Sequence, residues 1–373
     1  MIEVIRLAQG DLRNARRFLE LPFRIYESIP QWVPPIAGDA RRQLDRRRNP
    51  YFQHSRAEFL LAIRDGRAVG RMAVLDPENY NRFNGTRDAF FTLFECEPDD
   101  AVARALLDAG FDWARSRGLT VIRGPHGFSA LDGLGLLVKG FEHRPAFGIP
   151  YNPPYYERFL TDAGFAREAD ILSGYLGGHV VLPDRILRVG ERVMERRGLR
   201  VERFRKRGEL RRLAPKLGDL YNQSLGGTAG NVPLTDREID AIARQMIAFA
   251  DPRLIKVLSK GDEPVGFLFA YPDISAAVQR TKGRMWPFGW IEWLREMRTT
   301  QWVNVNGAGI TEGYRGLGGT ALLFTEMYRS VREGGFRHAV LVQIGSENFP
   351  MLRELREFGV DFYKTHRMFR KDL

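Results

Sequence analysis

The stretch WVNVNGAGITEGYRGLGGTALLF, residues 302–324, decides the fold of this chain. Its first part alternates valines with asparagines, at Val303, Asn304, Val305 and Asn306. Successive side chains of a strand point to opposite faces, so the pattern predicts a strand with one apolar face and one face that can hydrogen-bond a ligand. The end of the stretch has apolar residues at helical spacing and predicts a helix.

A glycine-rich turn joins the predicted strand to the predicted helix. Four glycines follow Ile310 within a short span, at Gly313, Gly316, Gly318 and Gly319. Glycine adopts positive φ without strain and lets backbone N–H groups approach an anion closely. The helix start contributes unpaired N–H groups and Arg315 adds a full positive charge. We therefore predict a phosphate cradle after Ile310.

The segment ITEGYRGLGGTALL resembles motif A of the GNAT superfamily of acyl-CoA-dependent N-acyltransferases. The resemblance implies that the turn wraps the pyrophosphate of coenzyme A, with acetyl-CoA or a longer acyl-CoA as co-substrate. The residues in register are Arg315, Gly316, Leu317, Gly318 and Gly319, and Ile310 and Thr320 are further candidates for binding the cofactor. Thr320 departs from the motif, which has a smaller residue there, and its Cβ could crowd the phosphate or its hydroxyl could bind it.

A dinucleotide-binding turn is the alternative, because Gly307-Ala308-Gly309 follows a strand. That fingerprint needs a third glycine at fixed spacing and an acidic residue at the end of the next strand. Here the third glycine comes one residue late, and the next strand, HAVLVQ, ends in Gln343.

The amino-acid composition limits the classes of protein to which the chain can belong. The chain has 373 residues, enough for two domains, and 44% hydrophobic with 28% charged residues is typical of globular proteins. Cys96 is the only cysteine and the six histidines have no paired metal-ligand spacing, so we expect no metal. A net charge of +11 favours anionic partners. No signal-like leader or membrane-length apolar run is present, so a cytoplasmic location is expected.

The two halves of the chain repeat one pattern. Hairpins are predicted at residues 57–75 and 254–271, and Gly70 and Gly266 in them lie 196 residues apart. Asn152 and Asn348 have the same separation. The predicted fold is α/β, with two tandem GNAT-like domains, each a mixed, mostly antiparallel sheet flanked by helices. Their predicted ranges are 1–180 and 197–373.

The two copies differ at the cradle. Where the second copy has glycines, the first reads ECEPDDAVARALL, with acidic residues including Glu97, Asp99 and Asp100 before its helix. Negative charge there would repel a pyrophosphate. We therefore predict that domain 1–180 is degenerate and contributes to the substrate cleft, and that domain 197–373 binds acyl-CoA.

Further residues are candidates for the chemistry. The run after HAVLVQ resembles a second GNAT pattern, in which Asn348 would cap a helix and face the pantetheine arm. Leu355 replaces the tyrosine that often protonates the departing thiolate in that family. Amide formation needs a proton acceptor, and the catalytic candidates are Glu347, Tyr363 and His366. Strand alternation puts Tyr363 and His366 on opposite faces.

Residues 124–156 form a long loop rich in glycine, proline and aromatic residues. Long ordered loops in compact domains are often functional. We predict that Tyr151, Asn152 and Tyr155 line a substrate cleft, and the alternative is a clasp at the domain interface. Asn304 and Asn306 are further candidates for substrate binding.

Residues 283–298, GRMWPFGWIEWLREMR, combine tryptophans with flanking arginines. This composition fits a lid over an apolar chain, with Trp286 and Trp290 against the substrate, or an amphipathic segment at a membrane interface. Ordinary burial against the other domain is the alternative. A membrane interface would place the protein at the inner face of the membrane.

The whole chain resembles the YghO-like, bacterial ceramide synthase-like branch of GNAT proteins. The resemblance rests on PFRIYESIPQWVPP (22–35), NPYFQHSRAEFLLAIRDGRAVGRMA (49–73), GPHGFS, GIPYNPPYYERFLTDAGF and KTHRMFRK. It implies transfer of a fatty acyl group from a CoA thioester to the amine of a long-chain base. Two alternatives are a non-catalytic acyl-CoA or lipid-binding protein and an RNA-partnered aminoacyl transferase. Scattered basic residues argue against a nucleic-acid partner.

Overall fold

The computed structural model describes residues 1–129, 132–182, 188, 196–225 and 232–373. Within these residues the chain forms two compact units. The first unit consists of Met1–Leu172, Ser275–Trp293 and Lys364–Leu373, and the second of Ser173–Ile274 and Leu294–Tyr363. These units differ from the predicted ranges 1–180 and 197–373, because each half of the sequence supplies segments to the unit built mainly from the other half.

The first unit has a sheet in the order β1-β2-β3-β4-β5-β13, with β6 paired to β13. Its strands are β1 (Ile2–Arg6), β2 (Arg56–Arg64), β3 (Arg67–Asp76), β4 (Asp88–Cys96), β5 (Val121–Gly124), β6 (Leu136–Lys139), most of β13 (Asp361–Asp372) and the start of β7 (Ala166–Gly177). Its helices are α1 (Leu12–Ile25), α2 (Ala37–Leu44), the 3-10 helix η1 (Pro50–Gln53), α3 (Glu78–Asn84), α4 (Asp100–Ser116), α5 (Tyr156–Asp162), α9 (Ser275–Arg280) and the start of α10 (Gly289–Thr299). Among its registered pairs, β4 and β5 are parallel and the others antiparallel.

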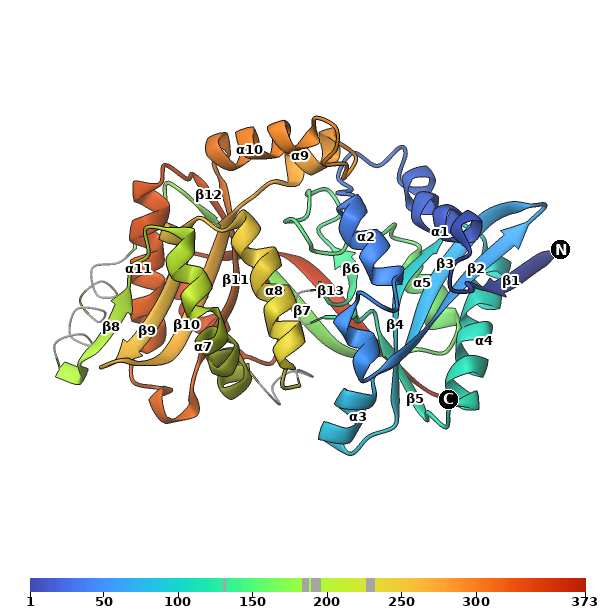
Figure 1. The fold of residues 1–373 in the computed structure, drawn as a ribbon, viewed down its shortest axis with the longest axis horizontal. Helices are drawn as coiled ribbons and strands as arrows, with labels where there is room; N and C mark the ends of the chain where they lie inside the picture. Colours follow the sequence, from blue (N-terminus) through green and yellow to red (C-terminus); the bar gives the residue numbers. More distant parts are fainter. Residues whose placement is uncertain (130–131, 183–187, 189–195, 226–231) are drawn as a thin grey trace. The chain divides into compact units, whose positions relative to one another are not determined.

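The second unit has a sheet in the order β7-β12-β11-β10-β9-β8 (Figure 1). Its strands are the end of β7, β8 (Leu199–Glu202), β9 (Ile255–Lys260), β10 (Glu263–Pro272), β11 (Trp302–Ile310), β12 (His338–Gly345) and the first residues of β13. Its helices are α7 (Arg207–Leu225), α8 (Asp236–Phe249), the 3-10 helices η2 (Pro252–Leu254) and η3 (Glu312–Tyr314), the rest of α10, α11 (Gly319–Glu333) and α12 (Phe349–Glu357). β8 to β11 pair antiparallel, whereas β11 and β12 run parallel.

Both predicted hairpins are present, and the prediction of two α/β sheets flanked by helices is confirmed. The first hairpin turns at Asp65 and Gly66, which both have positive φ, 50° and 74°. Two consecutive residues with positive φ match the right-handed twist of the flanking strands. The second hairpin, between β9 and β10, turns at Gly261, where φ is 59°.

Helices cover both faces of each sheet. In the second unit Val303 and Val305 pack in one core cluster with Leu322 and Leu323 of α11, so the valine face of β11 is the face that α11 covers. Leu210 of α7 packs with strand residues of β9 in a separate cluster. In the first unit α4 and α5 share one cluster with the sheet, and α1 shares another.

The two halves exchange their last strands. The end of β7 enters the second unit next to β12, and Ser173 Oγ accepts a hydrogen bond of 3.2 Å from the backbone N–H of Gln343. The end of β13 returns to the first unit, where Phe369 lies opposite Gly124 of β5. Sequence alternation is the same whichever sheet a strand joins, so the predicted domain ranges could not include this exchange.

The insertion in the second half packs on the first unit. The Gln279 amide donates 2.8 Å hydrogen bonds to the carbonyls of Pro30 and Trp32. The Gly283 carbonyl accepts a hydrogen bond from the backbone N–H of Ala37. These bonds explain why residues 275–293 belong to the first unit. In the part of the chain that the structure describes, no helix is both long and apolar enough to cross a membrane.

Candidate functional site

The segment between β11 and α11 has the backbone of an open anion cradle. Gly316 has a φ of 70° and Gly318, the N-cap of α11, a φ of 86°. Among the described residues, a Cβ added to Gly316 would meet no atom within 4 Å, and no side chain caps the start of the helix. The first N–H groups of a helix have no acceptor inside it. They therefore stand behind a glycine-lined opening, which fits an anion.

Arg315 connects the cradle to α7. Its side chain is exposed, and its Nε donates to the Ile310 carbonyl at 3.1 Å. Its Nη2 donates to the Ser224 carbonyl, near the end of α7, at 2.9 Å. Both bonds are to neutral carbonyls, so the guanidinium keeps its positive charge beside the cradle while its position is fixed.

Gly319 has a packing role, unlike Gly316. A Cβ on Gly319 would lie 2.7 Å from Leu258 Cδ2 and 3.1 Å from Ile310 Cδ1. Only glycine lets the first turn of α11 lie this close to the sheet. Leu317 and Thr320, which flank Gly318 and Gly319 in the sequence, are partly buried.

The parallel pair β11 and β12 stops pairing part-way along. Registered pairs run from Trp302 opposite His338 to Val305 opposite Leu341. Beyond that point β11 runs on to Ile310 and β12 to Gly345. Strand edges that no longer pair leave backbone donors and acceptors for a ligand. We call the point after Val305 and Leu341 the split.

A β-bulge lies at the split. In the pairing of β10 with β11, Leu268 lies opposite Ala308 and Ala270 opposite Val305, so Asn306 and Gly307 together face one residue of β10. Gly307 has a φ of 84°. A bulge re-aims backbone groups and is frequent next to active sites. On β12 the non-glycine residue Gln343 also has positive φ, 55°, on the other side of the split.

Asn304 heads a polar cluster on the face of β11 away from α11. It is buried, and its Nδ2 donates to Asp273 Oδ1 at 2.9 Å. Its Oδ1 is a buried acceptor with no partner in the described part of the chain. Tyr271 lies opposite Asn304 in the ladder. Burial raises the pKa of Tyr271 to about 12, and hydrogen bonds to Asn306 and Asn304 act in the opposite direction.

Tyr363 belongs to the same surroundings, since it lies in the second unit near Asp273. Burial, together with the charge of Asp273 and the neighbouring Tyr175, raises the pKa of Tyr363 to about 12. The rings of Tyr363 and Tyr175 meet edge to face, with their centroids 6.4 Å apart. Tyr363 therefore keeps its proton at neutral pH and can act as a proton donor.

The other two residues predicted beyond β12 lie at the surface. Glu347 is exposed in the turn before α12. Asn348 is the N-cap of α12, and its Oδ1 accepts a hydrogen bond of 3.3 Å from the Met351 N–H. The capping interpretation of Asn348 is confirmed, while its contact with a pantetheine arm stays a prediction.

Comparison with known proteins agrees with this geometry. No model of a known protein family matches the chain. Bacterial ceramide synthase from Caulobacter vibrioides is 26% identical over 96% of this chain and 94% of its own length. Protein YghO from Escherichia coli is 23% identical over 96% of this chain and 93% of its own.

Solved structures give the fold. A tandem GNAT protein from the clavulanic acid biosynthesis pathway superimposes with a TM-score of 0.56 at 14% identity, over 100% of this chain and 98% of the other. A GCN5-related N-acetyltransferase from Sphaerobacter thermophilus gives 0.52 at 13% identity, over 100% and 95%. The chain thus has the fold of tandem GNAT proteins and is similar over nearly its whole length to bacterial ceramide synthase and to YghO.

The first GNAT unit has a closed helix start where the second has the cradle. Only residues 97–99 join β4 to α4, and the Asp99 carboxylate accepts hydrogen bonds from the N–H groups of Ala101 and Val102 at 2.9 and 3.2 Å. Asp99 also pairs with Arg64 at 2.7 Å. A carboxylate thus accepts hydrogen bonds from the first N–H groups of α4.

The predicted cleft residues of the long loop have their polar groups bonded to backbone carbonyls. Tyr151 donates to Phe141 at 2.8 Å, and Tyr155 donates to Cys96 at 2.9 Å. Asn152 is buried and bonds both the N–H and the carbonyl of Leu137. These contacts fix the loop within the first unit. A substrate contact for the three residues stays a prediction.

Two of the predicted lid residues are exposed. Trp286 is 75% exposed and Trp290 41%, and the Trp290 Nε1 donates to the Pro287 carbonyl. Only Trp293 is buried among the three tryptophans of this segment, with its Nε1 donating to Thr281 at 2.9 Å. The other large exposed apolar residues nearby are Met285, Phe288, Ile291 and Leu294. Within the described residues, no other segment has as many large exposed apolar side chains.

His366 lies in the first unit, fully buried, with Nε2 3.0 Å from the Pro150 carbonyl. Burial, with a smaller contribution from the positive charge of Lys364, lowers the pKa of His366 to about 4, against the opposing effect of the hydrogen bond to Pro150. The neutral ring therefore donates to Pro150, and its buried Nδ1 has no partner in the described part of the chain. These contacts hold His366 within the first unit, and a catalytic role for it stays a prediction.

We predict that His366→Gln removes part of the acid sensitivity of the first unit. Because the folded-state pKa lies below the ordinary value of 6.5, His366 contributes stability that is complete above pH 6.5 and lost as pH falls to about 4. The difference between pKa values of 6.5 and about 4 corresponds to about 3 kcal/mol in the free energy of unfolding. Urea unfolding of the first unit at pH 7 and pH 4 should show this loss in the wild type and a smaller loss in the variant. Equal losses would contradict the assignment.

Sequence reasoning missed Asp273, Tyr271 and Tyr175. Tyr271 and Asp273 stand two residues apart in YPD at the end of a strand, a signal that carries little weight until the pairing partner Asn304 is known. The described residues contain no group of three or more histidine, cysteine or acidic side chains placed to hold a metal ion.

Proposed function

We propose that the chain is an N-acyltransferase that moves an acyl group from a coenzyme A thioester to an amine. The observation that carries the proposal is the open start of α11, where Gly316 and Gly318 have positive φ and, among the described residues, no atom lies within 4 Å of a Cβ added at Gly316. A pyrophosphate fits there, because helix N–H groups and an adjacent arginine are its usual partners. A bulge and a split in the same sheet support the same function.

The residues around the split have the chemistry that acyl transfer needs. When bound, the thioester supplies an activated acyl carbonyl. Backbone N–H groups at the bulge, near Asn306 and Gly307, would donate hydrogen bonds to its oxygen. Asp273 would accept a proton from the attacking ammonium or amine, and Tyr363 would give its proton to the departing thiolate.

We propose that the two GNAT units divide the work, with residues 197–373 holding acyl-CoA and residues 1–180 contributing to the acceptor side. The capped start of α4 supports this division, because Asp99 occupies its N–H groups. In the second unit no described side chain caps the corresponding N–H groups.

The acyl group we propose is long, and the acceptor a sphingoid-type long-chain base. The name of the Caulobacter relative supports this choice. The exposed apolar residues of 283–298 also support it, because they fit a lipid chain or a membrane surface, with Arg284, Arg295 and Arg298 beside them. A cytoplasmic enzyme working at the inner face of the membrane would meet both substrates there.

The double variant Trp286→Ser with Phe288→Ser should bind anionic phospholipid vesicles at least tenfold more weakly. Each buried aromatic side chain contributes about 1.5–3 kcal/mol, and these two are 75% and 72% exposed in the protein. Vesicle co-sedimentation measures the change. Phe83→Ser is the matched control, because Phe83 is 51% exposed on α3 outside this segment. The membrane proposal fails if the control loses as much affinity as the double variant.

The function itself is tested by free-thiol release from acyl-CoA with a panel of amines. The panel should contain short polyamines, amino sugars and long-chain bases, and the donors should range from acetyl-CoA to long-chain acyl-CoA. We expect turnover above background with long-chain donors and a long-chain base. Saturable acyl-CoA binding with no amine-dependent thiol release would indicate an acyl-CoA-binding protein and would contradict the proposed enzyme activity.

A further inference from the structure

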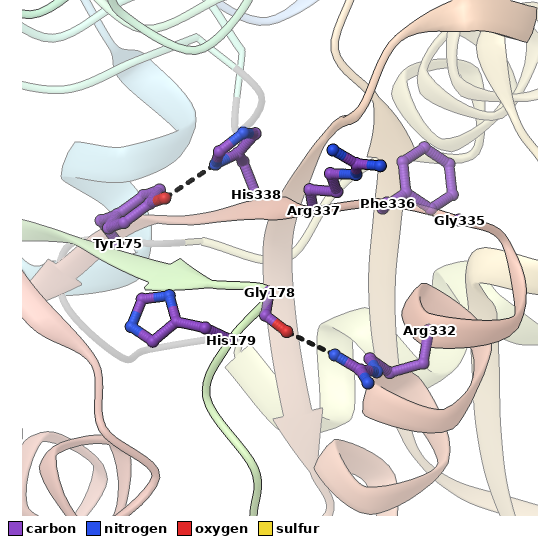
Figure 2. A pocket seen from close by; sticks show the side chains of 8 residues that line it. All are labelled: Tyr175, Gly178, His179, Arg332, Gly335, Phe336, Arg337 and His338. Atoms are coloured by element: carbon purple, nitrogen blue, oxygen red, sulfur yellow. Dashed lines mark hydrogen bonds between the residues drawn. The ribbon is translucent and has the colours of Figure 1, made fainter.

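A second basic site lies in the second unit at the opposite end of α11 from the cradle. There a pocket of about 540 Å³ opens where α11 ends and β12 begins (Figure 2). Two arginines, two histidines and a tyrosine line it, namely Arg332, Arg337, His179, His338 and Tyr175. The 15 residues of α11 make that helix about 22 Å long, so this pocket is separate from the cradle.

The pocket carries positive charge that its own lining does not neutralise. None of the described residues that line it is acidic. Arg337 is exposed, and its guanidinium makes no hydrogen bond or ion pair with the described residues. Elsewhere on α11, Arg329 pairs with Glu326 at 2.7 Å. The charge of Arg337 is therefore left without a carboxylate partner among the described residues.

Several of the lining groups are held in place before any ligand arrives. Tyr175 Oη lies 2.7 Å from His338 Nδ1, and the His338 ring stacks on Trp302 with centroids 4.3 Å apart. Arg332 Nη1 donates to the Gly178 carbonyl. The Gly178 N–H in turn donates to the Arg337 carbonyl at 2.6 Å. Fixed donors bind an anion with less loss of side-chain freedom.

The electrostatics of His338 agree with an anion site. Burial lowers its pKa below the ordinary histidine value, and the positive charge of Arg337 lowers it further. An anion between these two groups would offset that repulsion.

We propose that this pocket binds a phosphate group as a site distinct from the coenzyme A cradle. Two guanidinium groups and two imidazoles offer more N–H donors than the two oxygens of a carboxylate can accept, and they match the several oxygens of a phosphate. The phosphate can come from a soluble phosphomonoester or from a phospholipid headgroup, and both present the same chemistry to the pocket.

The test is calorimetric titration of the full chain with inorganic phosphate. Arg337→Gln should weaken binding about tenfold, the effect of losing a charge-assisted hydrogen bond. Its guanidinium makes no hydrogen bond or ion pair with the described residues, so the fold should tolerate the change. Arg211→Gln on α7 is the control, since Arg211 is exposed and its loss changes net charge equally. Arg315→Gln reports binding at the cradle.

The outcomes separate this site from the proposed transferase site. Weaker phosphate binding in Arg337→Gln, with Arg211→Gln and Arg315→Gln unchanged, supports the pocket even if the protein has no transferase activity. No saturable binding, equal binding by Arg337→Gln, or a loss confined to Arg315→Gln overturns it. Phosphatidylcholine vesicles with and without phosphatidic acid identify the source. Vesicle binding that needs both phosphatidic acid and Arg337 indicates a phospholipid headgroup. Binding of inorganic phosphate without such vesicle binding indicates a soluble ligand.

Discussion

Gly316→Val is expected to lower the affinity for coenzyme A by about 100-fold. The cradle would hold the pyrophosphate through several charge-assisted hydrogen bonds from backbone N–H groups, each contributing about 1.5–3 kcal/mol. A valine side chain at Gly316 would project into the open space where no protein atom lies within 4 Å. It would exclude the phosphates from those donors. Calorimetric titration with coenzyme A measures the loss directly, without requiring turnover.

Gly261→Val provides the matched control for this variant. Gly261, in the turn between β9 and β10, has a φ of 59° and also has open space around its absent Cβ. A β-branched residue at positive φ is strained at both positions, at about 1–3 kcal/mol. Both variants should therefore lose similar thermal stability, and only Gly316→Val should lose coenzyme A. If Gly316→Val binds coenzyme A as tightly as Gly261→Val, the cradle is not the cofactor site.

Asp273→Asn is expected to lower turnover by about 100- to 10,000-fold, the range for loss of a general base. Asparagine has nearly the same shape and still offers an oxygen to Asn304, whose Nδ2 now donates to the Asp273 carboxylate. It cannot take up a proton at neutral pH. Coenzyme A affinity should stay unchanged, because the proposed role concerns the amine. Steady-state thiol release together with coenzyme A titration separates the two effects.

Asp262→Asn is the control for the charge change. Asp262 lies in the β9–β10 turn, fully exposed, and pairs with Arg200 at 3.3 Å. Its replacement removes one carboxylate from the same unit and should leave turnover within a few-fold of wild type. A similarly small change in Asp273→Asn would remove Asp273 from the chemistry and leave the acyl-CoA site itself untouched.

Much of the second unit could be predicted from the sequence. Alternation of valine and asparagine predicted a strand with one apolar face, and in the structure the valine face of β11 packs with α11. The glycines after Ile310 predicted the turn, and Gly316 and Gly318 have the positive φ that was expected. The acids before α4 predicted the contrast between the units, and Asp99 caps that helix.

Other parts of the site could not be read from the chain. Tyr271, Asp273 and Asn304 come from two strands, and their association depends on the register of β10 with β11 and on the bulge within it. His366 looked like a candidate base because histidine often acts as one, but burial lowers its pKa to about 4. Burial depends on which strands and loops pack around a residue, and periodicity does not encode that.

The sequence alone determined the duplicated α/β pattern, the faces of the strands and the place of the cradle, because each depends on neighbours within a few residues. Only the tertiary structure decided that the halves exchange their last strands, that β11 and β12 part after Val305, and that Arg332 and Arg337 meet His338 around one pocket. These features arise from contacts between residues far apart in the chain. Their geometry is fixed when the sheets assemble, and local propensity leaves it open.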